Sequence, residues 1–243
     1  IFRQEGWHYE LESKDAPLIY NGVVYNEMKG VFSSPESVLD SYIHTAMFPD
    51  TCYGVESGGD PEEIVKLTYE DYLAFYHKYY HPCNSYIYLY GDMDVEERLD
   101  WMDRNYLSQF GPAEIDSSIE KQKPFDEIRY VETEYPITDD DPEEDNTYLS
   151  YNKVMADVLD RELYQAFSVL DYVLVRAPGA PVRQALIDAG IGQDVYGSFE
   201  DGMLQPFFSI VAKNANKEDQ ERFVSIIEET LQKLVKEGLN QDA

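Results

Sequence analysis

The sequence predicts an α+β fold in which an antiparallel β-sheet packs against helices. Strand-like segments come in neighbouring pairs along the chain instead of alternating strictly with helices, which argues against a doubly wound parallel sheet. Segments with helical periodicity stand before and after these pairs. The 243 residues, of which 43% are hydrophobic, suffice to bury one large core or two modest ones.

The first strand and helix are expected near the start of the chain. Residues 6–11, GWHYEL, alternate in polarity as a half-buried strand does, and residues 12–17 have the composition of a turn. From Asn21 the pattern becomes helical, and Gly30 interrupts it. Five residues are predicted to lie on one side of this helix: Val23, Val24, Glu27, Met28 and Val31.

Further helices and one strand follow before residue 111. Ser34 is the predicted N-cap of a helix that has Pro35 at its first position and runs to about Phe48. After a loop rich in Gly and Pro, Thr68 caps another helix, which the HPCN tetrapeptide at 81–84 ends. Residues 85–94 are predicted to form a short buried strand, and residues 95–110 a helix.

A linker is predicted at residues 111–124, which contain Pro, Ser and mixed charges without periodicity. It separates a first domain at 1–110 from a second at 125–243. The second domain is expected to hold strands at 125–137 and 146–156, a helix at 160–176, a short helix within 179–192, paired strands at 193–201 and 204–214, and a last amphipathic helix at 217–237.

The chain is strongly acidic, with a formal net charge of −29 and an excess of acidic residues in both halves. Phosphate contacts need a basic surface, so this charge argues against a nucleic-acid partner. Solubility is the simplest role for the charge, and attraction of basic peptides is a more specific hypothesis. No apolar run approaches the length of a membrane span, so we expect no membrane partner.

Two cysteines, Cys52 and Cys83, do not make a disulfide framework or a Cys-x-x-Cys metal motif. They fit a reducing setting, and we expect a cytoplasmic protein. The chain begins with Ile1, from which we expect a fragment or a processed product.

His77 and His81 have the i, i+4 spacing that can bind zinc on a helix. In the His-x-x-Glu-His motif of inverted zinc hydrolases, a glutamate occupies the position that Tyr80 holds here. A tyrosine with a reference pKa near 10 is a poor general base. Because His81 precedes Pro82, its backbone is expected to leave the helix. A structural role for both histidines is favoured.

Two other segments resemble motifs superficially. Residues 139–145, DDDPEED, lack the Asp-x-Asp-x-Asp-Gly spacing of a calcium loop and are read as an exposed acidic connection between strands. Residues 56–60, ESGGD, are read as a tight turn in which Gly58 and Gly59 supply positive φ, followed by a helix that starts at Asp60 and Pro61. His8 and His44 have no spaced partners that would indicate a nucleophilic triad.

The function of Glu27 cannot be assigned from the helical pattern alone. A carboxylate on the inner side of a helix is usually a residue at the edge of the buried face or a salt-bridge partner. Longer blocks around it, however, closely resemble the presequence-protease branch of the pitrilysin/insulinase zinc metallopeptidases, the inverzincins. These blocks are QEGWHYELE, GVVYNEMKGVFSSPESVL, FPDTCYGVESGGDPEEI, LTYEDYLAFYHKYYHPCNSYIYLYGDMD and residues 176–214. They cover essentially the whole chain in the family's order.

The resemblance implies incomplete α/β-roll domains of the pitrilysin/insulinase type, which enclose a chamber where short unstructured peptides are hydrolysed. It implies one Zn²⁺ held by the two histidines of His-x-x-Glu-His and by a downstream glutamate. On this sequence that glutamate is Glu27, in the block YNEMKG. Glu27 would supply charge and geometry to a metal-assisted hydrolysis, and the motif glutamate would supply the general base.

The chain departs from the family in one important respect, because His-x-x-Glu-His occurs nowhere in its 243 residues. The resemblance therefore implies part of a zinc oligopeptidase that has one of three zinc ligands and no catalytic base, and that is inactive alone. Its expected partners are peptide substrates and the remainder of the same polypeptide, while its substrate-binding residues stay unknown. The alternative is a non-catalytic homologue that acts as a structural or peptide-binding subunit.

Overall fold

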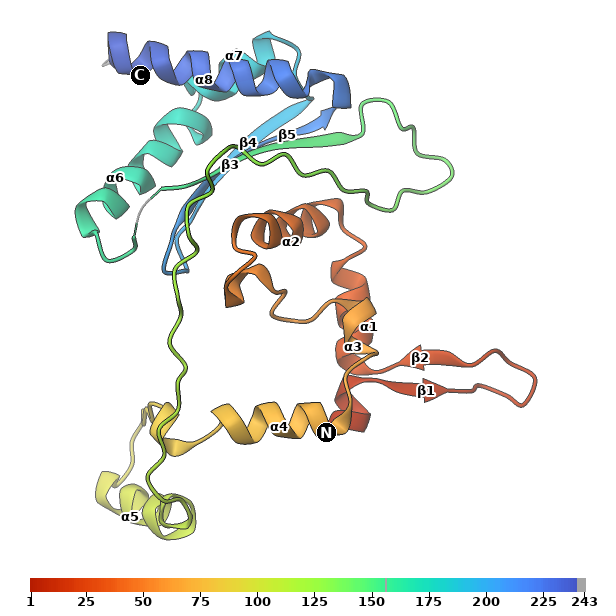
Figure 1. Ribbon diagram of the computed structural model, residues 1–243, viewed down its shortest axis with the longest axis vertical. Coiled ribbons are helices and arrows are strands. Elements are labelled where there is room, and N and C mark those ends of the chain that lie inside the picture. Colours follow the sequence, from red (N-terminus) through yellow and green to blue (C-terminus); the bar gives the residue numbers. More distant parts are fainter. Residues whose placement is uncertain (156, 240–243) are drawn as a thin grey trace. The chain divides into compact units, whose positions relative to one another are not determined.

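The computed structural model describes residues 1–155 and 157–239. Its contacts divide the chain into two compact units. Unit 1 comprises Ile1–Val31 and Glu56–Glu120, and unit 2 comprises Phe32–Val55 and Lys121–Ala243. Figure 1 labels the helices and strands of both units.

Unit 1 contains one short hairpin and four helices. Strand β1 (His8–Glu10) pairs antiparallel with β2 (Ile19–Asn21), which confirms the predicted strand within residues 6–11. The helices are α1 (Val23–Val31), α3 (Pro61–Ile64), α4 (Tyr69–Tyr79) and α5 (Val95–Asn105).

The helix starts that the sequence predicts are confirmed by side-chain caps. Asp60 accepts a hydrogen bond from the backbone N–H of Glu62 at 2.7 Å, where α3 begins. Thr68 and Asp71 form a reciprocal capping box at the start of α4. In unit 2, Ser34 caps α2 (Pro35–Met47) through the N–H of Ser37. These caps satisfy backbone donors that no carbonyl of the helix itself can reach.

The strand predicted at residues 85–94 is wrong. This segment has no helix or strand assignment, and alternate side chains, Tyr86, Tyr88 and Tyr90, are between 84% and 105% exposed. A strand exists only through hydrogen bonds to a neighbour, and the described part of the chain offers this segment none. The sequence has the composition of a strand, but composition does not supply the partner.

Unit 2 is built on a three-stranded antiparallel sheet in the order β3-β5-β4. Its strands are β3 (Thr147–Val154), β4 (Asp194–Glu200) and β5 (Phe207–Ala215). Ala212 of β5 stands opposite Leu149 on one side and Val195 on the other. The predicted antiparallel sheet and the strand pair around Gly202 are confirmed, and the strand predicted at 146–156 corresponds to β3, although Ala156 lies outside the described residues.

Four helices cover this sheet: α2, α6 (Arg161–Asp171), α7 (Pro181–Asp188) and α8 (Gln220–Glu237). The helix predicted at 160–176 changes after Asp171 into a π-helical turn at Tyr172–Arg176. The last predicted helix is confirmed as α8, preceded by a 3₁₀ turn at Lys217–Asp219. The strand predicted at 125–137 is wrong, because no residue of this segment pairs into the sheet.

The core of unit 2 lies on both faces of β5, because successive side chains of a strand point to opposite sides. Ile210 and Ala212 face α7 and α8, where Leu186, Phe223 and Ile227 are fully buried. Phe207 faces the other way and packs with Ile43 and Phe48 of the α2 segment. Figure 1 shows α7 and α8 on one side of the sheet and α2 on the other. The sheet is therefore the middle layer of a helix–sheet–helix arrangement.

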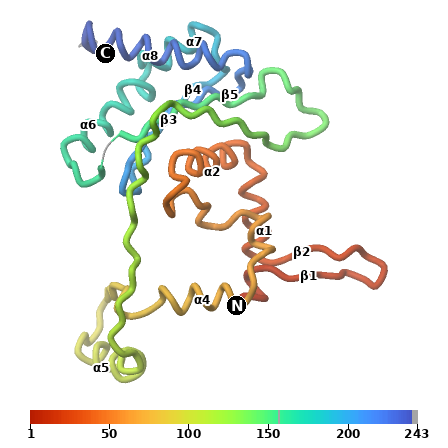
Figure 2. The backbone as a smooth tube through the Cα atoms, viewed as in Figure 1, coloured from red at the N-terminus to blue at the C-terminus, as the bar shows by residue number. Residues whose placement is uncertain are grey.

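Residues 111–137 contain no helix or strand, and Figure 2 shows their path as a continuous coil. The compact units place residues 32–55 with the sheet, although these residues precede the predicted linker. The contacts do not test the predicted division into a domain at 1–110, a linker at 111–124 and a domain at 125–243. That division stays a prediction. Among the described residues, no helix combines the length and apolar character that crossing a bilayer requires.

Candidate functional site

The position of Glu27 on α1 is fixed by its neighbour Met28. Met28 is 6% exposed and packs against Gly58 in the turn that follows. A Cβ on Gly58 would lie 2.4 Å from the Met28 sulfur, so a larger residue there would require the Met28 side chain to shift. Gly59 has φ +92°, as predicted, whereas Gly58 has no positive φ and is notable for its close packing instead. The blocks YNEMKG and YGVESGGDP, distant in sequence, therefore meet at this contact.

The start of α1 is held by Asn21 and Gly22. The Asn21 side-chain oxygen accepts hydrogen bonds from the backbone N–H of Gly22 at 2.8 Å and from the side chain of Asn26 at 2.6 Å. The Asn21 side-chain nitrogen donates to Glu10 of β1. Gly22 has φ +152°, and a Cβ there would lie 2.2 Å from the carbonyl oxygen of Gly6. The register of α1 relative to the hairpin is thus set by close backbone contact.

Glu27 itself is exposed, one position along the helix from buried Met28. Within residues 1–155 and 157–239, no hydrogen bond or ion pair reaches its carboxylate. A free carboxylate oxygen is a suitable zinc donor, but zinc sites in proteins use at least three protein ligands. No group of three His, Cys, Asp or Glu side chains among the described residues is arranged to hold a metal ion. The described residues therefore do not form a metal site around Glu27.

The histidines near the end of α4 have a structural arrangement. Helix α4 ends at Tyr79, and His81 has φ −137° and ψ 144°, so the two histidines do not share a helix face. The His81 Nδ1 accepts a hydrogen bond from the backbone N–H of Cys83 at 3.1 Å. This hydrogen bond caps the 3₁₀ turn at Pro82–Asn84, as the structural interpretation of this pair requires.

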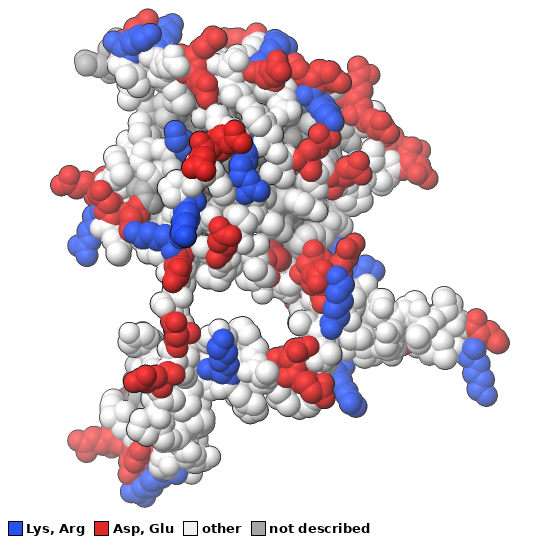
Figure 3. Space-filling model, viewed as in Figure 1, with Lys and Arg blue, Asp and Glu red and all other residues white. Residues whose placement is uncertain are grey.

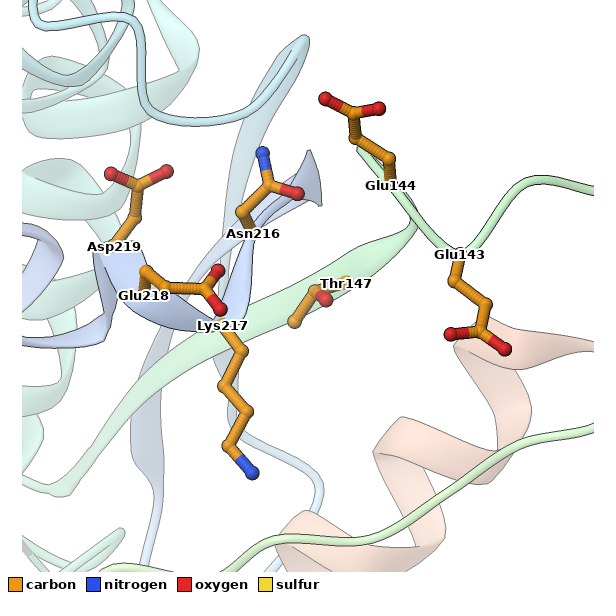
Figure 4. Close-up of a pocket in the computed structure, with 7 residues that line it drawn as sticks. All are labelled: Glu143, Glu144, Thr147, Asn216, Lys217, Glu218 and Asp219. Carbon is orange, nitrogen blue, oxygen red and sulfur yellow. The ribbon is translucent and has the colours of Figure 1, made fainter.

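Unit 2 has an open pocket of about 570 Å³ beside the acidic segment 139–145. Figure 4 shows that its lining comes from two places, the connection before β3 and the turn after β5. Four of the lining residues are acidic and one is basic: Glu143, Glu144, Glu218, Asp219 and Lys217. The Lys217 ammonium is paired with Glu132 at 2.5 Å, so the pocket is strongly acidic.

The acidic connection is pinned at Asp145, which has φ +55°. Its backbone N–H donates to the Asn216 side-chain oxygen at 3.0 Å, and its carboxylate accepts from the Asn216 side-chain nitrogen at 2.7 Å. Asn214, with φ +56°, donates from its side chain to the Asp145 carbonyl at 3.0 Å. Asn and Asp adopt this backbone region more readily than other non-glycine residues. The segment is therefore an ordered turn that presents its carboxylates to solvent.

A second polar cluster joins the start of α2 to the sheet. Glu36 accepts a hydrogen bond from the Tyr148 hydroxyl at 2.9 Å and is ion-paired with Lys213. The Lys213 ammonium also lies 5.5 Å from the centre of the Tyr148 ring. Hydrogen bonding to Lys213 lowers the pKa of Glu36 to about 2, and the same hydrogen bond raises the pKa of Lys213 above its ordinary value. Sequence analysis missed this cluster, because Glu36 and Lys213 are 177 positions apart.

The surface charge agrees with the composition. Figure 3 shows Asp and Glu spread over the visible face, with fewer Lys and Arg between them. The acidity is not confined to the pocket, so any electrostatic attraction of a cationic partner would come from the field of the whole chain.

The family model described as the peptidase M16 inactive domain matches residues 66–243. This chain belongs to the M16 peptidase family, which confirms the resemblance drawn from its sequence blocks.

Curated relatives match along the whole chain. Protein HypA of Clostridium perfringens is 46% identical over 242 residues, covering 100% of this chain and 25% of that protein. Presequence protease 1, chloroplastic/mitochondrial, of Arabidopsis thaliana is 39% identical over 247 residues, covering 100% of this chain and 23% of that protein. The chain thus spans about a quarter of the length of these relatives.

Solved structures confirm the α+β fold. A crystal structure of a peptidase M16 inactive domain from Pseudomonas fluorescens has a TM-score of 0.61 at 19% identity, covering 90% of this chain and 52% of that one. A chain of complex III2 from Candida albicans has a TM-score of 0.62 at 15% identity, covering 87% of this chain and 50% of that one. At these identities the likeness supports the fold alone.

Proposed function

We propose that this chain is part of a zinc-dependent oligopeptidase that hydrolyses short unstructured peptides, and that Glu27 is one of its zinc ligands. The observation that carries the proposal is Glu27 itself. Its carboxylate is exposed and has no partner among the described residues, on a helix held in place by Met28, Gly58 and Gly22. Membership of the M16 family and similarity to presequence proteases support the reaction class.

When bound, zinc would act as a Lewis acid that polarises the peptide carbonyl and lowers the pKa of a coordinated water. Glu27 would contribute one negatively charged oxygen donor. The chain would supply no general base, because the His-x-x-Glu-His motif is absent from its sequence. The second predicted domain, residues 125–243, would form part of the chamber wall and of the substrate-binding surface, and it lies within the match to the inactive-domain model at residues 66–243.

The test is metal analysis of the complete encoded protein. We expect about one zinc ion per chain, because a catalytic site has three protein ligands and an open position. Removal of the metal with a chelator should abolish cleavage of an unstructured peptide, and added zinc should restore it. The 243-residue chain alone should show neither tight zinc binding nor cleavage. Full activity of the metal-free protein would refute the proposal.

The proposed partners are peptide substrates and the remainder of the same polypeptide, and neither nucleic acid nor membrane. With a net charge of −29, the complete protein should cleave a basic peptide faster than an acidic peptide of equal length at low ionic strength. This difference should shrink as salt screens the field, over a Debye length of about 10 Å at 0.1 M. Equal cleavage rates for the basic and the acidic peptide at low salt would contradict the proposed electrostatic preference. We further propose a cytoplasmic location, which the free thiols of Cys52 and Cys83 support.

A non-catalytic homologue, acting as a structural or peptide-binding subunit, is the second candidate. It is favoured by the match of residues 66–243 to an inactive domain. The residues encoded before Ile1 separate the two candidates, because only the enzyme requires His-x-x-Glu-His there. If that motif is absent from the gene, the peptidase proposal fails.

A further inference from the structure

We propose that residues 121–129 form a strap that connects the loop after α2, residues 48–54, to the chain entering β5, and that Gln122 is the anchor of this strap. The strap, the loop and β5 all belong to unit 2. The strap and the loop then open together, as one cooperative unit of local unfolding. The inference is independent of the assignment of Glu27 as a zinc ligand.

Gln122 is a buried polar residue in a segment without regular structure, where only 5% of its surface is exposed. Of the buried polar residues in the described part of the chain, it alone lies outside a helix or strand. A buried amide is costly unless its donors and its acceptor are paired. The hydrogen bonds of Gln122 therefore identify what holds this segment in place.

The side chain of Gln122 joins the strap to the loop after α2. Its Oε1 accepts a hydrogen bond from the backbone N–H of Asp50 at 2.9 Å, and its Nε2 donates to the Asp50 carboxylate at 2.7 Å. Nε2 also donates to the carbonyl of Lys123 at 3.4 Å. This orientation of the amide is the only one that fits Asp50, because an N–H cannot accept and an ionised carboxylate cannot donate.

The backbone of Gln122 joins the strap to the chain entering β5. Its N–H donates to the side-chain oxygen of Gln205 at 2.6 Å, and its carbonyl accepts from the Gln205 Nε2 at 3.1 Å. Pro206 and Phe207, which follow Gln205, are buried. Gln122 thus connects two segments that lie 72 and 83 positions away from it in the sequence.

The ends of the strap have weaker attachments. Lys121 forms an ion pair with Asp157, and the two side chains are 54% and 29% exposed. The Arg129 guanidinium donates to the carbonyl of Ala46, in the last turn of α2, at 2.7 Å and lies 4.7 Å from the centre of the Phe125 ring. Exposed ion pairs contribute little to stability. Most of the restraint on the strap is therefore assigned to Gln122.

The two links of Gln122 are arranged in series. One link runs from the loop to the Gln122 side chain, and the other runs from the Gln122 backbone to Gln205. Breaking either link disconnects the loop from β5 along this route, so breaking the second adds little. The loop keeps direct contacts with this part of the chain, because the Leu204 N–H donates to the Tyr53 hydroxyl at 3.0 Å. Loss of the strap should therefore loosen the loop without unfolding the sheet.

The experiment measures two rates in the complete protein. The first is hydrogen exchange of the amides of Phe48, Thr51 and Gly54, which are bonded to carbonyls of α2 or of the loop itself and not to Gln122. The second is tryptic cleavage after Arg129, at the far end of the strap. Neither rate changes merely because Gln122 or Gln205 loses its own hydrogen bond, so both report opening of the segment.

Gln122→Leu removes the link to Asp50, and Gln205→Leu removes the link to the Gln122 backbone. Each should raise both rates about 10-fold, because each removes two hydrogen bonds whose combined net contribution is close to a tenfold change in an equilibrium. The double variant should be little faster than either single variant. Exchange of β4 should stay as in the wild type. Asp50→Ala, at an exposed position where folding is not at risk, should raise both rates about threefold because it removes one acceptor.

Gln184→Leu is the matched control, because Gln184 is an exposed residue of α7 in the same unit and bonds to Asp188 at 2.7 Å. It should leave both rates unchanged. Wild-type rates in Gln122→Leu and Gln205→Leu would overturn the proposal, and so would wild-type rates in Asp50→Ala if the buried variants did not fold. Effects that multiply fully in the double variant would show two independent links in place of one strap. Faster exchange of the loop without faster cleavage after Arg129 would show that the two segments do not open together.

Discussion

Glu27→Gln is expected to lower the zinc affinity of the complete protein by more than about 100-fold. Loss of a residue that only orients a metal ligand commonly lowers metal affinity 10–100-fold, and loss of the ligand itself should lower it further. The substitution keeps the shape of the side chain but removes its negative charge. Because Glu27 is exposed and has no hydrogen-bond partner in residues 1–155 and 157–239, its replacement by an amide should leave the fold intact. Chelator competition measures the affinity, and hydrogen exchange of α1 verifies the structure.

Glu70→Gln provides the matched control for this prediction. Glu70 is an exposed residue in the first turn of α4, within the same unit, and undergoes the same change of charge. It should leave zinc affinity as in the wild type. Equal affinity of Glu27→Gln and wild type would contradict the ligand assignment, and an equal loss in both variants would show a general charge effect.

The parts of the fold that the sequence predicts correctly are those determined within a few residues. The sequence predicts caps at Ser34 and Thr68 and a helix start at Asp60, because an N-cap side chain bonds to a backbone N–H two or three positions later. The strands around Gly202 were predicted for a similar reason, since β4 and β5 are separated by only six residues. Local chemistry is sufficient for such features.

Features that depend on distant partners were predicted poorly. Residues 85–94 and 125–137 have strand composition, but a strand needs a neighbour whose identity local sequence does not give. Gly58 is predicted to have a positive φ, whereas the structure shows that it packs closely against the sulfur of Met28, thirty positions earlier. The Glu36–Lys213 pair gives no sequence signal, because its two residues are 177 positions apart and nothing in either block links them.

The candidate site also combines a feature set by nearby residues with features that depend on distant ones. Helical periodicity put Glu27 and Met28 on one side of the helix, whereas the structure buries Met28 and exposes Glu27. The assignment of Glu27 as a ligand rests on family resemblance alone, and no described residue completes a metal site around it. What the structure adds is the close packing of the neighbouring Met28 against Gly58, which supports the helix that carries Glu27.

The second large effect is expected for Phe48→Ala, which tests whether residues 32–55 belong with the sheet. Phe48 is fully buried, and its ring centre lies 6.0 Å from that of Phe207 and 5.9 Å from that of Tyr53. Truncation of such a side chain costs about 3–5 kcal/mol, through lost burial and the cavity left behind. Since 1.4 kcal/mol is tenfold, local opening should increase by at least about 100-fold. Hydrogen exchange of α2 in the complete protein should accelerate accordingly.

Tyr42→Ala separates this effect from a general loss of aromatic area near α2. Tyr42 is on the same helix but is 42% exposed, so its truncation should change exchange of α2 only slightly. A Phe48→Ala, Phe207→Ala double variant should lose less than the sum of the two single losses, because both rings line one cluster. Unchanged exchange of α2 in Phe48→Ala would mean that this helix does not depend on the sheet. Fully additive losses would mean that the Phe48 and Phe207 rings do not support each other.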